Sequence, residues 1–193
     1  EQLTTTPNQY ASEEVESNYG YISGYKRPIP VAEQVAILRK LFPELKDATC
    51  DEIVENRPLP NGAEGYFAIP RFEKIVLTYG EAVEKIIALL HKQRNGKVNN
   101  YREGQLDERY LRLSTKTEQA LQTIGEEQQG HDILIIPTQF GLRHAGRSVR
   151  RALEVMNATE FGLDPFSTGV MLLTHPHRLN HYDDLWIDLS GCE

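Results

Sequence analysis

The last third of the chain constrains the fold most, because two short apolar runs flank a helical pattern there. The runs Asp132–Pro137 and Gly169–Thr174 have the length and composition of buried strands. Between them, Ser148–Asn157 repeats apolar residues at helical spacing. A strand, a helix and a strand at these distances predict a βαβ unit with parallel strands. We expect a third strand at Leu185–Leu189.

The rest of the chain adds amphipathic helices to this sheet. Apolar residues three and four positions apart predict helices over residues 31–42, 81–94 and 107–129. A capping-box pattern opens a shorter helix over residues 49–56, and residues 73–79 alternate enough for a strand. We therefore predict an α/β (or α+β) fold, with a small, mainly parallel sheet, a C-terminal βαβ unit and several amphipathic helices packed on it.

The length of 193 residues fits one domain. Residues 1–30 are polar and then rich in tyrosine, glycine and proline, which favours an N-terminal arm, partly disordered at its start, that lies on the body. We expect residues 31–193 to form a single globular α/β domain. The last predicted strand ends close to residue 193, so a natural chain that extends further is compatible with the sequence.

The charge and cysteine content narrow the choice of partners. With 21 basic and 28 acidic residues the net charge is −7, which disfavours nucleic acid as a partner. No apolar run approaches the ~20 residues of a membrane helix. Cys50 and Cys192 belong to no paired motif and are expected to be free thiols in a reducing, cytoplasmic compartment. The sequence does not identify a cofactor.

An arginine-rich segment without acidic residues joins the first predicted strand to its helix. Arginines in a first helical turn oppose the positive end of the helix and cost stability unless an anion compensates. Glycines let the backbone approach such an anion, and a serine can donate a hydrogen bond to it. We therefore expect a small anionic ligand, with phosphate-bearing compounds as the leading class. The predicted ligand-binding residues are Arg143, Gly146, Arg147, Ser148 and Arg150.

The same arginines also have a structural interpretation. Arginine commonly forms forked ion pairs, and the chain offers 28 carboxylates. The spacing matches no Walker or dinucleotide-binding fingerprint. The alternative function is therefore a noncatalytic domain in which the arginines hold the structure together or contact a protein partner.

Histidines cluster after the second apolar run. His175 and His177, two positions apart at a strand end, would face the same side, and His181 with Asp183 could complete a metal-ligand set. A metal-dependent hydrolase is therefore a second alternative. The structural interpretation of this segment is a polar hairpin loop.

Both patterns would meet if the two predicted strands were parallel. Their following loops would then leave the same carboxyl edge of the sheet, which is where open α/β folds bind ligands. An enzyme built this way would use His144 or His175 for proton transfer, with Asp183 orienting the ring.

Part of the chain, residues 66–188, resembles bacterial proteins to which no function is assigned. The segments that carry the resemblance are Tyr101–Gln105, Gly130–Leu134, Gln139–His144 and Asp183–Asp188. The resemblance implies a bacterial origin and no particular fold, activity or site.

Overall fold

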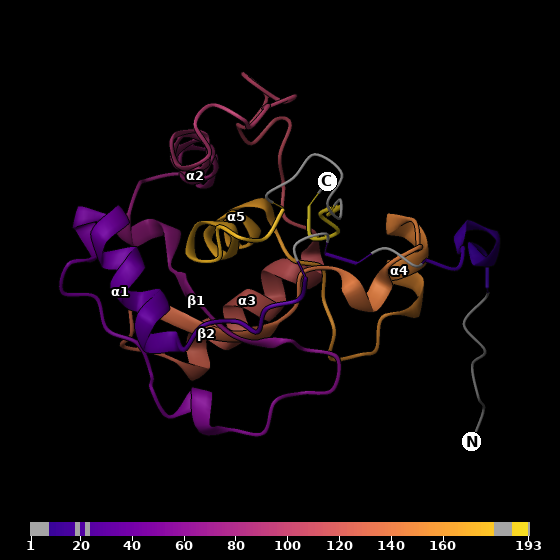
Figure 1. Ribbon diagram of the computed structural model, residues 1–193, viewed down its shortest axis with the longest axis horizontal. Helices are drawn as coiled ribbons and strands as arrows, with labels where there is room; N and C mark the ends of the chain where they lie inside the picture. Colours follow the sequence, from indigo (N-terminus) through magenta and orange to yellow (C-terminus); the bar gives the residue numbers. More distant parts are fainter. Residues whose placement is uncertain (1–7, 18–19, 22–23, 180–186, 193) are drawn as a thin grey trace.

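The computed structural model describes residues 8–17, 20–21, 24–179 and 187–192. Its α-helices are α1 (Val31–Leu41), α2 (Tyr79–Gln93), α3 (Thr115–Glu127), α4 (Val149–Val155) and α5 (Pro165–Thr174) (Figure 1). Short 3-10 helices accompany them: η1 (Ala11–Glu13), η2 (Pro43–Leu45), η3 (Val54–Asn56), η4 (Phe72–Lys74) and η5 (Leu142–His144). The strands are β1 (Gly65–Pro70) and β2 (Ile133–Thr138).

The described sheet consists of β1 and β2, which run antiparallel with Phe67 opposite Ile136. The prediction of a mainly parallel sheet with a C-terminal βαβ unit is therefore wrong. The first predicted strand exists as β2, but its partner β1 comes from earlier in the chain and was not predicted. Without parallel strands, the expected crevice at a shared carboxyl edge loses its topological basis.

The second apolar run, Gly169–Thr174, belongs to α5 and is not a strand. Asp164 begins this helix, since its Oδ1 accepts a hydrogen bond from Ser167 N at 3.0 Å, and Pro165 takes the first helical position. A six-residue apolar run looks the same in a buried strand and in a helix that is buried on several sides. The residues at the start, Asp164 and Pro165, indicate a helix here, whereas the apolar run alone does not distinguish a helix from a strand.

Glutamine side chains close both outer edges of the sheet. The buried Gln34 amide on α1 accepts from Ala68 N at 3.0 Å and donates to Tyr66 O at 2.9 Å. The buried Gln128 amide, directly after α3, accepts from Ile135 N at 2.8 Å and donates to Ile135 O at 3.0 Å. An open edge would leave these backbone groups unpaired, so each glutamine takes the place of a further strand.

The direction in which the backbone groups point explains why two prolines lie in the strands. The glutamines contact the backbone of residues 68 and 135 on the side away from the partner strand. The backbone nitrogens of Pro70 and Pro137, each two positions further along its strand, face the same way. The N–H that proline lacks would therefore not have taken part in a hydrogen bond between the two strands.

The remaining predictions differ in how far they hold. The helices expected over residues 31–42, 81–94 and 148–157 are present as α1, α2 and α4. The helix expected over 107–129 is helical only in α3, and that over 49–56 only in η3. Residues 73–79 form no strand: η4 ends at Lys74, turns and bends follow, and α2 begins at Tyr79. Residues 187–189 have no regular structure, and residues 185–186 lie outside the described part.

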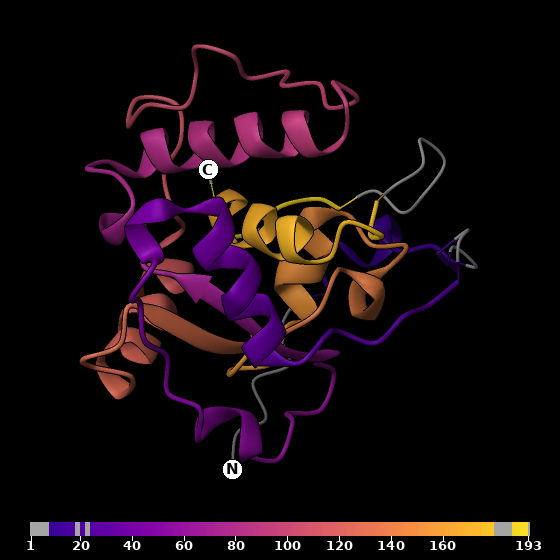
Figure 2. The ribbon, with the colours of Figure 1, turned by 60° about the vertical axis from the view of Figure 1, so that its left-hand side comes forward.

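Helix α5 lies at the centre of the molecule. It packs against α2 on one side and β1 on the other, and α1 also covers β1 (Figure 2). Gly169 permits the close approach of α2, because a Cβ there would lie 2.2 Å from Ile86 Cγ2. The buried apolar side chains of these elements form one core.

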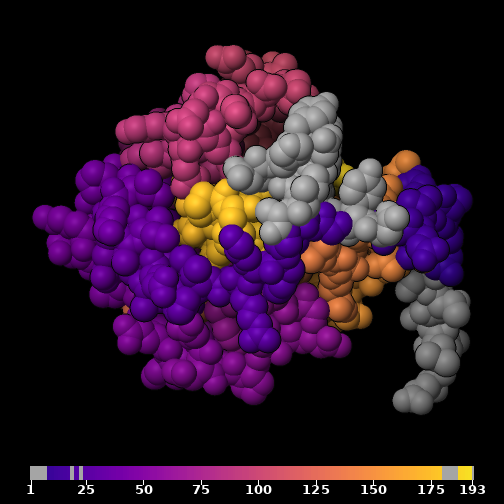
Figure 3. Space-filling model, viewed as in Figure 1, coloured from indigo at the N-terminus to yellow at the C-terminus, as the bar shows by residue number. Residues whose placement is uncertain are grey.

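The N-terminal part of the chain lies on the surface of this body. Residues 8–17 pack beside α4 at one end of the molecule (Figures 1 and 3). Tyr21 and Tyr25 place their rings 4.3 and 5.0 Å from the buried Arg178 guanidinium. The start of the arm, residues 1–7, lies outside the described residues.

Two structural observations concern the cysteines and the hydropathy of the helices. Cys50 and Cys192 are both free thiols. Among the described residues, no helix has the length and apolar character that crossing a membrane requires.

Candidate functional site

Residues 8–17, which we call the N-terminal strap, supply acids to three arginines around the start of α4. Arg147 donates to Glu14 Oε1 from Nε at 2.9 Å and from Nη2 at 2.7 Å. Arg151 Nε donates to the other oxygen of Glu14 at 2.8 Å, and Arg150 Nη2 donates to Glu13 at 2.5 Å. We call these three residues, Arg147, Arg150 and Arg151, the arginine row.

The positive charge that the sequence indicated is thus balanced within the chain. Hydrogen bonds from Arg147 and then Arg151 lower the pKa of Glu14 to about 2, so this carboxylate is ionised at neutral pH. Arg151 also donates to Glu154 Oε2 at 2.8 Å. In the structure, the arginine row holds the strap on the body, as the structural interpretation of these residues requires.

The other predicted ligand-binding residues near the row also contact the strap. Ser148 Oγ donates to Glu13 at 2.5 Å and accepts from Arg151 N at 3.1 Å, which makes it the N-cap of α4. Gly146 O accepts from Val15 N at 2.9 Å. A helix of seven residues such as α4 offers a weak dipole, so the guanidinium groups dominate the local charge.

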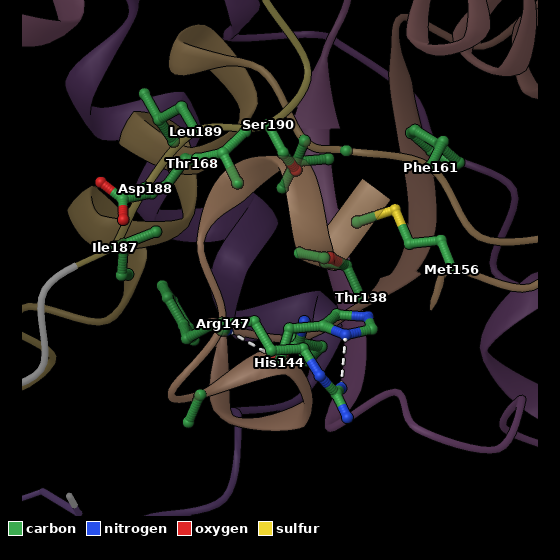
Figure 4. Close-up of a pocket in the computed structure, with 18 of the residues that line it drawn as sticks. Thr138, His144, Arg147, Met156, Phe161, Thr168, Ile187, Asp188, Leu189 and Ser190 are labelled. Carbon is green, nitrogen blue, oxygen red and sulfur yellow. Dashed lines mark hydrogen bonds between the residues drawn. The ribbon is translucent and has the colours of Figure 1, made fainter. Parts of the chain in front are cut away.

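His144 ends the turn η5, which local contacts hold in place. Gly141 has a φ of 98°, a conformation that favours glycine, and its N–H donates to Gln139 Oε1 at 2.5 Å. Arg147 Nη1 lies 3.1 Å from His144 Nδ1 (Figure 4). A guanidinium can only donate, so Nδ1 accepts and the ring proton sits on Nε2.

The surroundings of His144 favour its neutral form. Burial lowers the pKa of the ring, and the charges of Arg147 and Arg143 lower it further against the opposing effect of Glu160. Nε2 lies 4.0 Å from Glu160 Oε2, too far for a hydrogen bond. At neutral pH the Nε2–H of His144 therefore donates no hydrogen bond to Glu160.

Two neighbouring cavities share His144 in their walls. The larger, of about 390 Å³, lies between the loop of residues 58–63, β2 and the segment of residues 156–163. Arg143, His144 and Glu160 form part of its polar wall. Its apolar wall includes Ile124, Ile135, Met156, Phe161 and Leu163.

The smaller cavity, of about 220 Å³, lies beside Arg147 (Figure 4). Both cavities are lined by Thr138, Gln139, His144, Met156, Phe161 and Leu163. We call the two cavities together the recess. The end of β2 and the turn that follows it bring polar groups to its otherwise apolar wall, as is common in small-molecule sites.

Arg143 belongs to this recess and not to the arginine row. It forms an ion pair with Glu160, whose Oε2 accepts from Asn157 N at 2.8 Å. Gly62 makes room for the guanidinium, because a Cβ there would lie 2.3 Å from Arg143 Nη1. The pair joins η5 to the segment that closes the recess.

His175, predicted as a catalytic or metal-binding residue, is buried in the core. Its Nε2 accepts from Ile29 N at 3.1 Å, and its Nδ1 lies 3.1 Å from Met171 O. Burial lowers its pKa to about 4. His175 lies in the wall of neither cavity. Its two ring nitrogens contact the backbone of Ile29 and of Met171 and thereby connect residue 29 to α5.

Of the predicted metal ligands, His175 and His177 lie in the described part of the chain. The His177 ring lies 5.9 Å from that of His175, and burial followed by the charge of Arg178 lowers its pKa. Among the described residues, no three His, Cys, Asp or Glu side chains are placed to hold a metal ion. His181 and Asp183 lie outside the described residues.

Sequence reasoning missed the acids that complete these contacts. Glu13 and Glu14 are consecutive and face a segment of opposite charge, so charge complementarity could have suggested their pairing. No sequence pattern around Glu160 indicates its pairing with Arg143, because the pair depends on the path of the chain after α4.

Comparisons with protein families, with curated proteins and with solved structures found no match for the chain.

Proposed function

We propose that the protein binds a small molecule with an apolar body and a hydrogen-bond-accepting, anionic head in the recess beside His144. The observation that carries this proposal is the state of the imidazole: Arg147 occupies Nδ1, so a neutral ring presents its Nε2–H at a wall shared by two cavities. Of the three predicted catalytic residues, His144 is the one that this proposal retains.

The chemistry of the wall supports an acceptor as the ligand's head. The Nε2–H of His144 and the guanidinium of Arg143 donate, and the hydroxyl of Thr138 can donate as well. Glu160 already neutralises Arg143, so a carboxylate or a phosphate monoester suits the site better than a more highly charged group. The same Nε2–H would serve as the proton donor if the bound ligand reacts.

The size and lining of the larger cavity support an apolar body. Its volume of about 390 Å³ lies within the roughly 300–1,000 Å³ usual for small-molecule sites. Aliphatic and aromatic side chains, among them Ile124 and Phe161, form the wall away from His144. A benzene ring or a short alkyl chain attached to the head would bury its surface there.

Amide chemical shifts measured during titration test the proposal. Benzoate and phenyl phosphate are expected to shift the amides of Thr138, His144 and Phe161, whereas benzamide, which has the same shape as benzoate but no charge, should bind at least tenfold more weakly. The variant His144→Phe should lose the response. The matched variant His91→Phe, at an exposed position on α2, should keep it.

Two results would overturn this function. One is the absence of shifts at these amides with both anions at millimolar concentration. The other is equal affinity for benzoate and benzamide, which would remove the anionic head from the proposal.

A further inference from the structure

We propose that the surface beneath the N-terminal strap is a docking site for an acidic peptide of another protein, and that the strap is its built-in, displaceable occupant. The surface comprises the arginine row with Gly146 and Ser148. This inference goes beyond the ligand recess and does not depend on it.

At Glu14 the strap pairs with the body through backbone hydrogen bonds of the kind found between antiparallel strands. Val15 N donates to Gly146 O at 2.9 Å, and Ser148 N donates to Glu13 O at 3.1 Å, so that Glu14 and Arg147 form an antiparallel bridge. These backbone contacts would accept any chain that turns once, as the strap does in η1, and is extended at the residue that follows. Gly146 is required for the approach, because a Cβ there would lie 2.2 Å from Val15 O.

Side chains then select two consecutive acids. Glu13 contacts Ser148 and Arg150, whereas Glu14 contacts Arg147 and Arg151. Adjacent carboxylates thus reach different partners, and together they engage the whole arginine row. A single acid would leave part of the row uncompensated.

An aromatic residue three positions before the acids adds a further contact. The Arg150 guanidinium lies 5.0 Å from the centre of the Tyr10 ring. The backbone amides of Gln9 and Tyr10 donate to the Glu154 carboxylate at 2.7 and 3.3 Å. The partner that fits this surface is therefore a peptide with an aromatic residue followed, after two residues, by two acids.

The strap lacks the apolar anchor that would make its attachment permanent. Among residues 8–17, all of which the structure describes, none is buried, and Val15 is 67% exposed. Its contacts are polar and partly open to solvent, so water or another acidic chain can replace them. Segments held in this way open locally while the core stays folded.

Release of the strap would uncover three arginines side by side in a protein whose net charge is −7. An acidic peptide in trans restores the lost ion pairs and the two backbone hydrogen bonds. Competition between the strap and such a peptide is therefore the expected behaviour of the full chain.

A peptide-binding measurement on the 193-residue chain tests the proposal. The probe is a fluorescent synthetic peptide of residues 8–17, and the proteins are the unaltered chain and the variant Glu13→Gln/Glu14→Gln. We expect the variant to bind the peptide at least tenfold more tightly than the unaltered chain, because its own strap competes less. The variant Glu16→Gln, at an exposed position of the same strap, should behave like the unaltered chain.

A second peptide, in which glutamine replaces both glutamates, separates charge recognition from unspecific binding without a further change in the protein. It should bind the double variant at least tenfold more weakly than the acidic peptide. Equal affinity for the two peptides, or no binding of the acidic peptide to the double variant, would overturn the proposal.

Discussion

At the scale of single residues, His144 and His175 show how differently the same side chain can be used. Arg147 holds His144 at a cavity wall with its N–H free of the nearby Glu160. His175 is fully buried and joins the backbone of Ile29 to that of Met171. The sequence offers both rings as proton carriers, because the contacts that separate them come from residues far along the chain.

The buried histidine makes stability depend on pH. The folded-state pKa of His175 is about 4, below the ordinary value of 6.5, so the unfolded chain takes up the proton first as the pH falls. The free energy of unfolding should therefore fall between pH 6.5 and pH 4 by up to about 3 kcal/mol from this residue. Urea denaturation at several pH values should show a smaller decrease for His175→Gln than for the unaltered chain, and an unchanged decrease for the exposed-site variant His91→Gln.

Two glycines offer a matched pair of substitutions. Gly141 and Gly146 both have positive φ, but only Gly146 lies where a Cβ would collide with the strap. Gly146→Ala should release the strap, and Gly141→Ala should cost about 1 kcal/mol of backbone strain and leave the strap in place. Hydrogen exchange of the Val15 amide reports the difference, and equal protection in both variants would contradict it.

At the scale of elements, a sheet of two strands depends on side chains from its neighbours. Gln128 pairs both backbone groups of Ile135 and is buried. Gln128→Ala leaves these groups without partners and should destabilise the protein by about 2–4 kcal/mol. Gln119→Ala, at an exposed position on α3, should change stability by less than about 0.5 kcal/mol in the same denaturation experiment.

Elements whose signal is local were predictable, and elements defined by distant contacts were not. The helices α1 and α2 follow from apolar periodicity, and β2 from a β-branched run. The run in α5 gave the wrong structure because its burial comes from α2 and β1 on opposite sides. Strand β1 contains a glycine and ends in proline, and only its pairing with β2 and with Gln34 makes it a strand.

At the scale of the whole molecule, acids from the N-terminal strap neutralise arginines more than 130 residues away. The sequence revealed the concentration of positive charge but not its partners, because pairing over that distance is decided by the fold. The candidate site could therefore be predicted in part. Arg143 and His144 line the recess, Arg147 lines it and also contacts the strap, and Ser148 and Arg150 contact the strap.

Acid should detach the strap before the core unfolds. The pKa of Glu14 is about 2 in the folded chain, below its ordinary value of 4.5, so its contribution is complete above pH 4.5 and disappears as the pH falls towards 2. The amide shift of Val15 should therefore move towards its random-coil position as the pH falls from 4.5 towards 2. A midpoint at or above pH 4.5 would show that the arginine row does not hold this carboxylate.

The central claim is that Arg147 fixes the proton of His144 on Nε2, so that a neutral ring faces the recess. Long-range nitrogen–proton correlation spectra of the imidazole test this most directly. We predict, at pH 7, an unprotonated Nδ1, a protonated Nε2 and a pKa below 6.5. Arg147→Ala should raise the pKa and allow the tautomer with the proton on Nδ1 to form. A proton on Nδ1, or a charged ring at pH 7, would contradict the account.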